Sequence, residues 1–204
     1  MLGLSLKAGT AKSAEPKLNT YVKPIFDFFG EQNRYNAIKD RLWPQYESIE
    51  GIEASDKAFW GTSRLAVKTF EFEKEKEEEY KRLYDINLGI VREELINLFN
   101  GNFTMAKKYI TQKIADSGFR TPAITIKATE TDASLDNTNE KLSAALSAVT
   151  SVRASVGSGK QDFNIMLSDG SVMSMAFTTR TNKVGAMHKL GQFQNLAVKF
   201  NKIS

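Results

Sequence analysis

Apolar positions in the last third of the chain predict one helix followed by several strands. Between 139 and 149 they fall at the i, i+3, i+4 and i+7 spacing of one helix face (Leu142, Ala145, Leu146 and Val149), and Asn139 is a suitable N-cap. Short β-forming runs follow at 151–156, 162–168, 171–180 and 196–203. A second helix, from Lys183 to about Asn195, is expected before the last strand, because Thr181-Asn182 can cap it.

The turn between the second and third runs is the strongest local signal in the chain. Asp169-Gly170 suits a two-residue hairpin, because a type I′ turn requires positive φ at both central positions. We therefore predict a β-hairpin over Asp162–Arg180, within a compact unit that covers 139–204.

The first half of the chain has helical periodicity instead. Residues 63–100 place apolar side chains on roughly one face, interrupted by the charged run 71–79, which is typical of a solvated helix surface. A second helix is expected at 104–116, and the alternating segment 123–129 predicts a strand. The helix over 63–100 could also bind a partner or form a homo-oligomer.

Aromatic residues with basic residues between them fill the segment 20–60. Core packing of short helices and a stacking platform for single-stranded nucleic acid both explain this pattern. We favour core packing. The aromatic residues are Tyr21, Phe26, Phe28, Phe29, Tyr35, Trp43, Tyr46, Phe59 and Trp60.

These patterns predict a flexible arm at 1–19, a helical region at 20–118 and an α/β core at 119–204. The expected fold class is therefore α+β or α/β, with a helical N-terminal region followed by a mixed β-sheet core flanked by helices.

Composition excludes several kinds of chemistry. The 204 residues include no cysteine and a single histidine, His188, so disulfides, a cysteine nucleophile and a multi-histidine zinc site are excluded. No signal peptide or membrane span is evident, and we expect a cytoplasmic protein, in the host cytoplasm or a virion if it is phage-encoded. The net charge of +4 permits a nucleic-acid partner without requiring one.

The order helix, three strands, helix, strand, with Asp162 at the start of the second strand, resembles the PD-(D/E)XK nuclease core. The resemblance implies that Asp162 is the metal-binding aspartate and that Glu140, on the first helix, assists it. It also implies a Glu-x-Lys pair on the third strand, but Ala176 and Thr178 stand at those two positions. Magnesium is the metal expected if any nuclease activity exists, although a site reduced to Asp162 and Glu140 is poor for catalysis.

Basic and polar residues near the hairpin are candidates for contact with DNA. Lys160 lies on the glycine-rich turn 157–161, which lacks the spacing of a phosphate-binding P-loop. Salt-sensitive, sequence-independent contacts with the phosphate backbone are expected from these residues. The candidate nucleic-acid-binding residues are Lys160, Arg180, Lys183, His188, Lys189 and Gln192.

We therefore predict a phage-like protein with a degenerate nuclease-like core that binds DNA, or a complex that processes DNA, without cleaving it. Two alternatives remain open. One is a structural or assembly protein of a virion, of the neck or head-completion type. The other is an active magnesium-dependent deoxyribonuclease whose catalytic residues have been misassigned or mutated.

Overall fold

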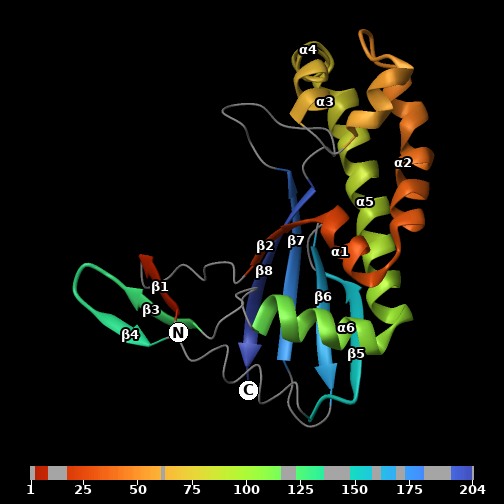
Figure 1. The fold of residues 1–204 in the computed structure, drawn as a ribbon. Coiled ribbons are helices and arrows are strands. Elements are labelled where there is room, and N and C mark those ends of the chain that lie inside the picture. The colour runs from red at the N-terminus through yellow and green to blue at the C-terminus, as the bar shows by residue number, and fades with distance from the viewer. Residues whose placement is uncertain are drawn as a thin grey trace.

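Among the described residues, helices fill most of the first half of the chain and strands fill most of the second half. The computed structural model describes residues 3–8, 18–60, 63–115, 123–135, 148–157, 162–168, 173–181 and 194–203. Within these ranges the fold is α+β: a layer of helices packs against one face of an antiparallel sheet, and a smaller sheet lies to one side (Figure 1).

Five strands form the main sheet, in the order β2-β8-β7-β6-β5. β2 spans Leu18–Tyr21, β5 Ser151–Val156, β6 Asp162–Ser168, β7 Met173–Thr181 and β8 Gln194–Ile203. β6 and β7 pair as the predicted antiparallel hairpin, with Asp162 opposite Thr178 and Leu167 opposite Met173.

The expectation that the main sheet is mixed needs correction. All four pairings in the five-stranded sheet are antiparallel, and the described helices that contact it pack on one face. β8 begins at Gln194 and pairs directly with β7, so Gln194 and Asn195 belong to a strand rather than to the predicted helix 183–195. The remainder of that helix and most of the helix 139–149 lie outside the described residues.

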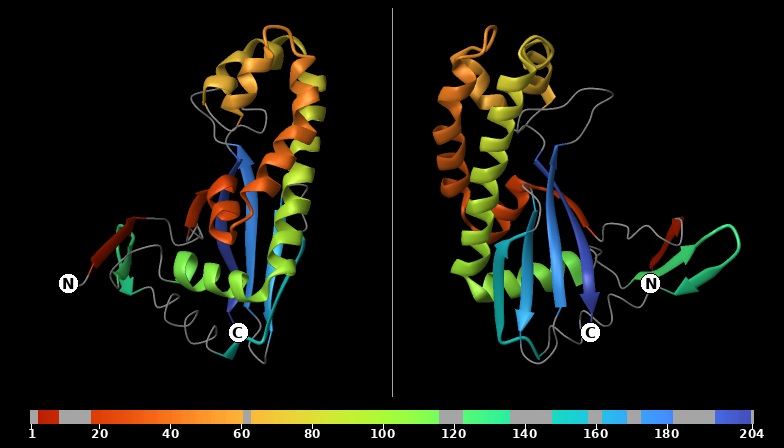
Figure 2. Two further views of the ribbon diagram at one scale, coloured as in Figure 1. Left: turned by 45° about the vertical axis from the view of Figure 1, so that its right-hand side comes forward. Right: turned by 180° about the vertical axis from the view of Figure 1, so that it is seen from behind.

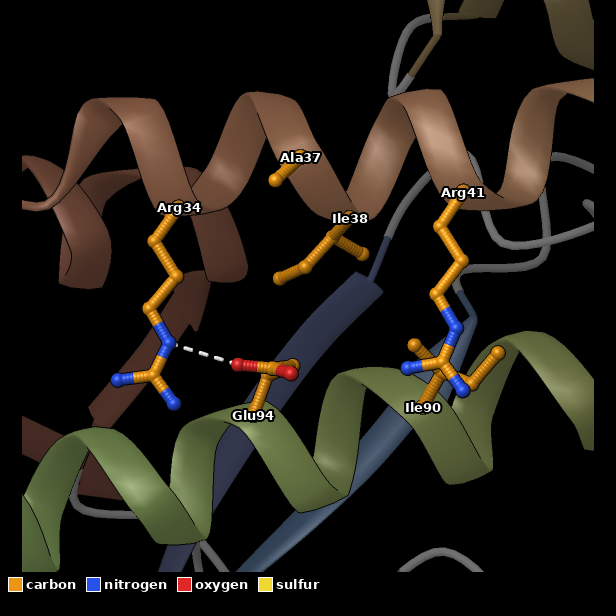
Figure 3. A pocket seen from close by; sticks show the side chains of 6 residues that line it. All are labelled: Arg34, Ala37, Ile38, Arg41, Ile90 and Glu94. Atoms are coloured by element: carbon orange, nitrogen blue, oxygen red, sulfur yellow. Dashed lines mark hydrogen bonds and ion pairs between the residues drawn. The ribbon is translucent and has the colours of Figure 1, made fainter.

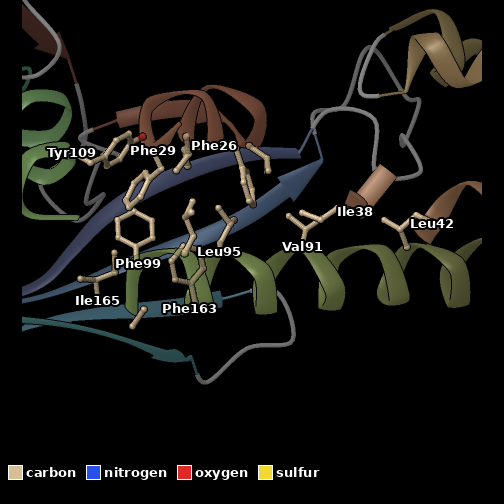
Figure 4. Packing of buried hydrophobic residues seen from close by; sticks show 14 of the residues in the cluster. Phe26, Phe29, Ile38, Leu42, Val91, Leu95, Phe99, Tyr109, Phe163 and Ile165 are labelled. Carbon is tan, nitrogen blue, oxygen red and sulfur yellow. The ribbon is translucent and has the colours of Figure 1, made fainter. Parts of the chain in front are cut away.

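Strand alternation explains which face of the sheet is covered. Phe163, Ile165 and Leu167 are buried, whereas Met166, between the last two, is 46% exposed. Successive side chains of a strand point to opposite faces, so the odd-numbered positions of β6 form the core face. Figure 4 shows Phe163 beside Phe99 from the long helix, and their ring centroids are 6.2 Å apart.

An aromatic cluster joins three helices to this core face. α1 (Val22–Phe29) contributes Phe29, α5 (Glu77–Gly101) contributes Phe99, and α6 (Phe103–Tyr109) contributes Tyr109. Phe29 lies 5.2 Å from Phe99, and Phe99 lies 5.8 Å from Tyr109, both in edge-to-face geometry, which is favourable for aromatic pairs. Gly30 ends α1 with φ of 75°, a conformation that favours glycine.

The aromatic residues of 20–60 are largely core residues, which confirms the interpretation we favoured. Phe26, Phe29, Trp43, Tyr46 and Trp60 are buried, and they hold α1 and α2 (Gln32–Glu47) against α5. Tyr21 is the exposed exception, at 47%. A 3-10 helix at Ala54–Phe59 follows α2.

The predicted helix 63–100 is present but divided. α3 covers Ser63–Lys68, α4 covers Phe70–Glu75, and α5 begins at Glu77 after Lys76 leaves helical geometry (φ −131°, ψ 54°). The apolar stripe of α5 is buried within the chain, so these side chains do not supply a free oligomer surface. The predicted helix 104–116 is also divided, into α6 and a π-helical segment at Ile110–Ala115.

A second, three-stranded sheet has the order β1-β3-β4. β1 (Gly3–Ala8) runs parallel to β3 (Ala123–Ala128), and β4 (Ala133–Leu135) pairs antiparallel with β3. β1 and the first two residues of β2 fall in the predicted flexible arm 1–19, so the described parts of that segment are paired strands. The ribbon views place the small sheet on the side of the main sheet where β2 forms the edge, next to β8 (Figure 2).

Candidate nucleic-acid interface

The nuclease resemblance singled out three positions on the hairpin, and the strand register brings them together. Asp162 is paired with Thr178, and Asn164 is paired with Ala176. Directly opposed residues of an antiparallel pair lie on the same face, and so do residues two apart on one strand. Asp162, Ala176 and Thr178 therefore share the outer face of the sheet, opposite the helices.

Arg180 joins the same face, because it lies two positions beyond Thr178 on β7. The other predicted site residues lie outside the described residues. They are Glu140, Lys160, Lys183, His188, Lys189 and Gln192.

Four rows of paired positions cross the outer face. The first runs Arg153, Met166, Ser174, Lys202, and the second runs Ser155, Asn164, Ala176, Lys199. The third runs Asp162, Thr178, Ala197, Asn19, and the fourth runs Arg180, Asn195, Tyr21. Every charged residue in these five strands falls on the outer face, and none falls on the core face.

The charges on this face are unbalanced. Four positions are basic (Arg153, Arg180, Lys199 and Lys202) and Asp162 is the single acid. Serine, alanine and threonine occupy half of the other positions in these rows. Arg153 and Lys202 are separated by three strand spacings, or about 14 Å, which is comparable to the width of the DNA major groove.

Acidic and basic residues are also distributed unevenly along the whole chain. Residues 31–101 contain 15 acidic and 11 basic residues, whereas the remaining residues contain 9 acidic and 17 basic residues. Residues 31–101 are therefore net acidic, and the rest of the chain, which contains all the described strands together with α6 and α1, is net basic. Such asymmetry is typical of proteins that present one basic surface to a polyanion.

The residues of this face do not fit a catalytic magnesium site. Magnesium requires several hard oxygen ligands, and Asp162 is the single carboxylate that the five strands contribute to the face. Among the described residues there is also no group of three or more histidine, cysteine, aspartate or glutamate side chains that could hold a metal ion. We therefore derive no metal-dependent step.

The sequence interpretation omitted Arg153 and Lys202 from the candidate site. Alternation of apolar residues over 151–156 would have placed Arg153 on this face. Lys202 could not be found in this way, because a β-bulge between Phe200 and Lys202 shifts the alternation, and without it Lys202 would lie on the core face. Lys199 is paired with Ala176, so it lies on the same face as Arg180.

A small pocket lies between α2 and α5, away from the sheet, and no sequence pattern pointed to it. Figure 3 shows Arg34 and Arg41 reaching from α2 toward Glu94 and Ile90 on α5, with Ala37 and Ile38 between the two arginines. Arg34 Nε donates to Glu94 Oε2 at 2.7 Å.

No family model, curated protein or solved structure matches this chain. None of the described helices is both long enough and apolar enough to cross a membrane.

Proposed function

We propose that this protein binds DNA through its phosphate backbone, on the outer face of the five-stranded sheet, without cleaving it. The observation that carries the proposal is the placement of all the charged residues of the sheet on one face, where basic residues outnumber acidic ones by four to one. Phosphate contacts of this kind supply affinity without reading sequence.

The composition of the face favours backbone contact over base stacking. Single-stranded nucleic acid is usually held by aromatic side chains on which bases stack, and Tyr21, at the edge of the sheet, is the single aromatic residue in the four rows. We therefore expect the protein to bind duplex DNA at least as tightly as single-stranded DNA of the same length.

The absence of cleavage follows from the ligands on the face. Phosphodiester hydrolysis by a PD-(D/E)XK site needs the acidic residue and the lysine that Ala176 and Thr178 replace. We therefore propose a protein that binds DNA without cleaving it, either alone or within a complex that processes DNA.

Fluorescence anisotropy with labelled duplex DNA tests the proposal. The wild-type chain should bind with an affinity that falls as salt rises, with a log–log slope of about −3 to −4 if four phosphates are contacted. Replacing Arg153, Arg180, Lys199 and Lys202 with glutamine should remove most of the binding and bring the slope toward zero.

A charge-matched control separates local contact from net charge. Replacing Lys74, Lys76, Lys81 and Arg82 with glutamine makes the same change in net charge on exposed positions of α4, α5 and the residue between them. This control should retain binding more fully than the sheet variant does. Equal losses in the two variants, or no salt-sensitive binding at micromolar protein, would contradict the proposal.

A further inference from the structure

The pocket between α2 and α5 has the size of a side chain rather than of a metabolite. Its volume is about 110 Å³, and it is lined by Arg34, Ala37, Ile38, Arg41, Ile90 and Glu94 (Figure 3). Pockets for cofactors and drug-sized ligands usually measure roughly 300–1,000 Å³, whereas one water molecule occupies about 30 Å³ in the liquid. The available space therefore suits a group of a few heavy atoms.

The two arginines of the pocket differ in the contacts that they make. Arg34 forms an ion pair with Glu94, and the distance from Arg34 Nε to Glu94 Oε2 is 2.7 Å. Arg41, two helical turns further along α2, makes no ion pair or hydrogen bond with any residue that the structure describes. In Figure 3 its guanidinium lies over Ile90, at the side of the pocket opposite the ion pair.

The charge of the pocket defines the kind of anion that fits it. Arg34, Arg41 and Glu94 together carry a net charge of +1, so one carboxylate makes the occupied pocket neutral. A phosphate group, with a charge of about −1.5 to −2, would leave an excess of negative charge beside Glu94. A guanidinium can also bind a carboxylate through two parallel hydrogen bonds.

The remaining lining matches an aliphatic stem. Ala37, Ile38 and Ile90 provide an apolar surface between the charged ends, which suits the methylene groups of an aspartate or glutamate side chain. The pocket lies within residues 31–101, where acidic residues outnumber basic ones, so a nucleic acid would be repelled by its surroundings.

We propose that this pocket receives the carboxylate of an aspartate or glutamate side chain from a partner polypeptide, with Arg41 as the main binding residue. Arg34, held by Glu94, forms the second wall of the pocket. This site is separate from the sheet face and does not depend on the protein binding DNA.

Titration of the full chain with a hexaglutamate peptide, followed by calorimetry, tests the proposal. Hexaglutamate should bind saturably, and a hexaglutamine peptide should not. Arg41→Gln should weaken the binding about tenfold or more, because a hydrogen-bonded charge pair is lost. Arg82→Gln, which removes an exposed arginine that does not line the pocket, should leave the binding unchanged.

Three results would overturn the proposal. The first is no binding of hexaglutamate at millimolar peptide by a chain whose circular dichroism shows that it is folded. The second is equal binding by the wild-type chain and Arg41→Gln. The third is displacement of hexaglutamate by inorganic phosphate more effectively than by acetate, which would assign the pocket to a phosphate group instead.

Discussion

The side-chain amide of Asn100 is hydrogen-bonded twice to the backbone of Ala154. The Ala154 N–H donates to Asn100 Oδ1 at 2.7 Å, and Asn100 Nδ2 donates to the Ala154 carbonyl at 3.0 Å. β5 is an edge strand of the five-stranded sheet, so no other strand among the described residues binds these two backbone groups. Asn100, in the last turn of α5, thus occupies the place of a further strand and blocks pairing with another chain at that point.

Asn100→Ala is expected to lower the free energy of unfolding by about 1–2 kcal/mol, because two hydrogen bonds are lost and an edge is left open. Urea unfolding measures this change, and size-exclusion chromatography measures the self-association that an open edge would promote. Asn97→Ala, at an exposed position one turn earlier on α5, should change neither quantity. A wild-type unfolding curve for Asn100→Ala would show that the amide contributes little.

Lys68→Met is expected to destabilise the helical region by about 2 kcal/mol, since it leaves the carboxylate of Asp56 buried without its cation. Asp56 is 1% exposed, and its Oδ2 accepts hydrogen bonds from Lys68 Nζ at 2.6 Å and from the backbone N–H of Glu53 at 2.9 Å. Thermal unfolding checks the loss. Lys81→Met, which removes an ion pair with Glu77 whose two side chains are more than half exposed, should have little effect.

The same pair predicts a dependence of stability on acid. The hydrogen bond from Lys68 holds the pKa of Asp56 below its ordinary value of 3.8. The stabilisation is therefore fully present above pH 3.8 and is lost as the pH falls through the lower pKa of the folded state. Asp56→Asn should flatten this part of the stability profile. An unchanged acid limb would contradict the assignment.

Two tyrosines predict a loss of stability in alkali. Burial raises the pKa of Tyr35 from 10.0 to about 12, with a further contribution from Asp27, and burial raises the pKa of Tyr46 well above its ordinary range. The unfolded chain loses these protons first, so stability is complete below pH 10 and falls as the pH rises toward 12. Tyrosinate absorbance of the folded chain should show both residues still protonated at pH 11, whereas titration of all six tyrosines near pH 10 would contradict this.

Magnesium should not make the wild-type chain nick supercoiled plasmid DNA. The double substitution Ala176→Glu with Thr178→Lys places the missing pair on the face that already holds Asp162. Magnesium-dependent nicking by this variant, and not by the same variant with Asp162→Asn, would support the nuclease-like alignment. Nicking by the wild-type chain would contradict the proposal that the protein binds DNA without cleaving it.

The hairpin strands were predictable because their signals are local. The strand β6 has its predicted limits, 162–168, since apolar and polar residues alternate between clear turn residues, and β5 likewise matches 151–156. β1 and β2 were not predicted, because each is stabilised by a strand more than one hundred residues away. Their own composition, small and polar, is typical of a flexible segment.

The candidate sites likewise contain one part that local signals predict and one part that depends on contacts between distant residues. The positions of Asp162 and Thr178 follow from strand length and turn length, so the sequence could bring them together. Arg34 and Glu94 are 60 residues apart and belong to helices whose relative rotation is decided by packing around Ile38, Val91 and Leu95 (Figure 4). No spacing in the sequence reports that rotation, and the pocket beside them was therefore not predictable.

The pairing of β2 with β8 determines the order in which the chain can assemble. Leu18 is paired with Val198, and β2 has no other partner strand among the described residues. Roughly 180 residues must be synthesised before this edge can form, and closing so long a loop is entropically costly. Helices α1–α6 could gather around their aromatic cluster while the chain is still on the ribosome, but β2 must wait for β8. A nascent chain halted before residue 194 should therefore leave Leu18–Tyr21 accessible to protease, whereas the full-length chain should protect it.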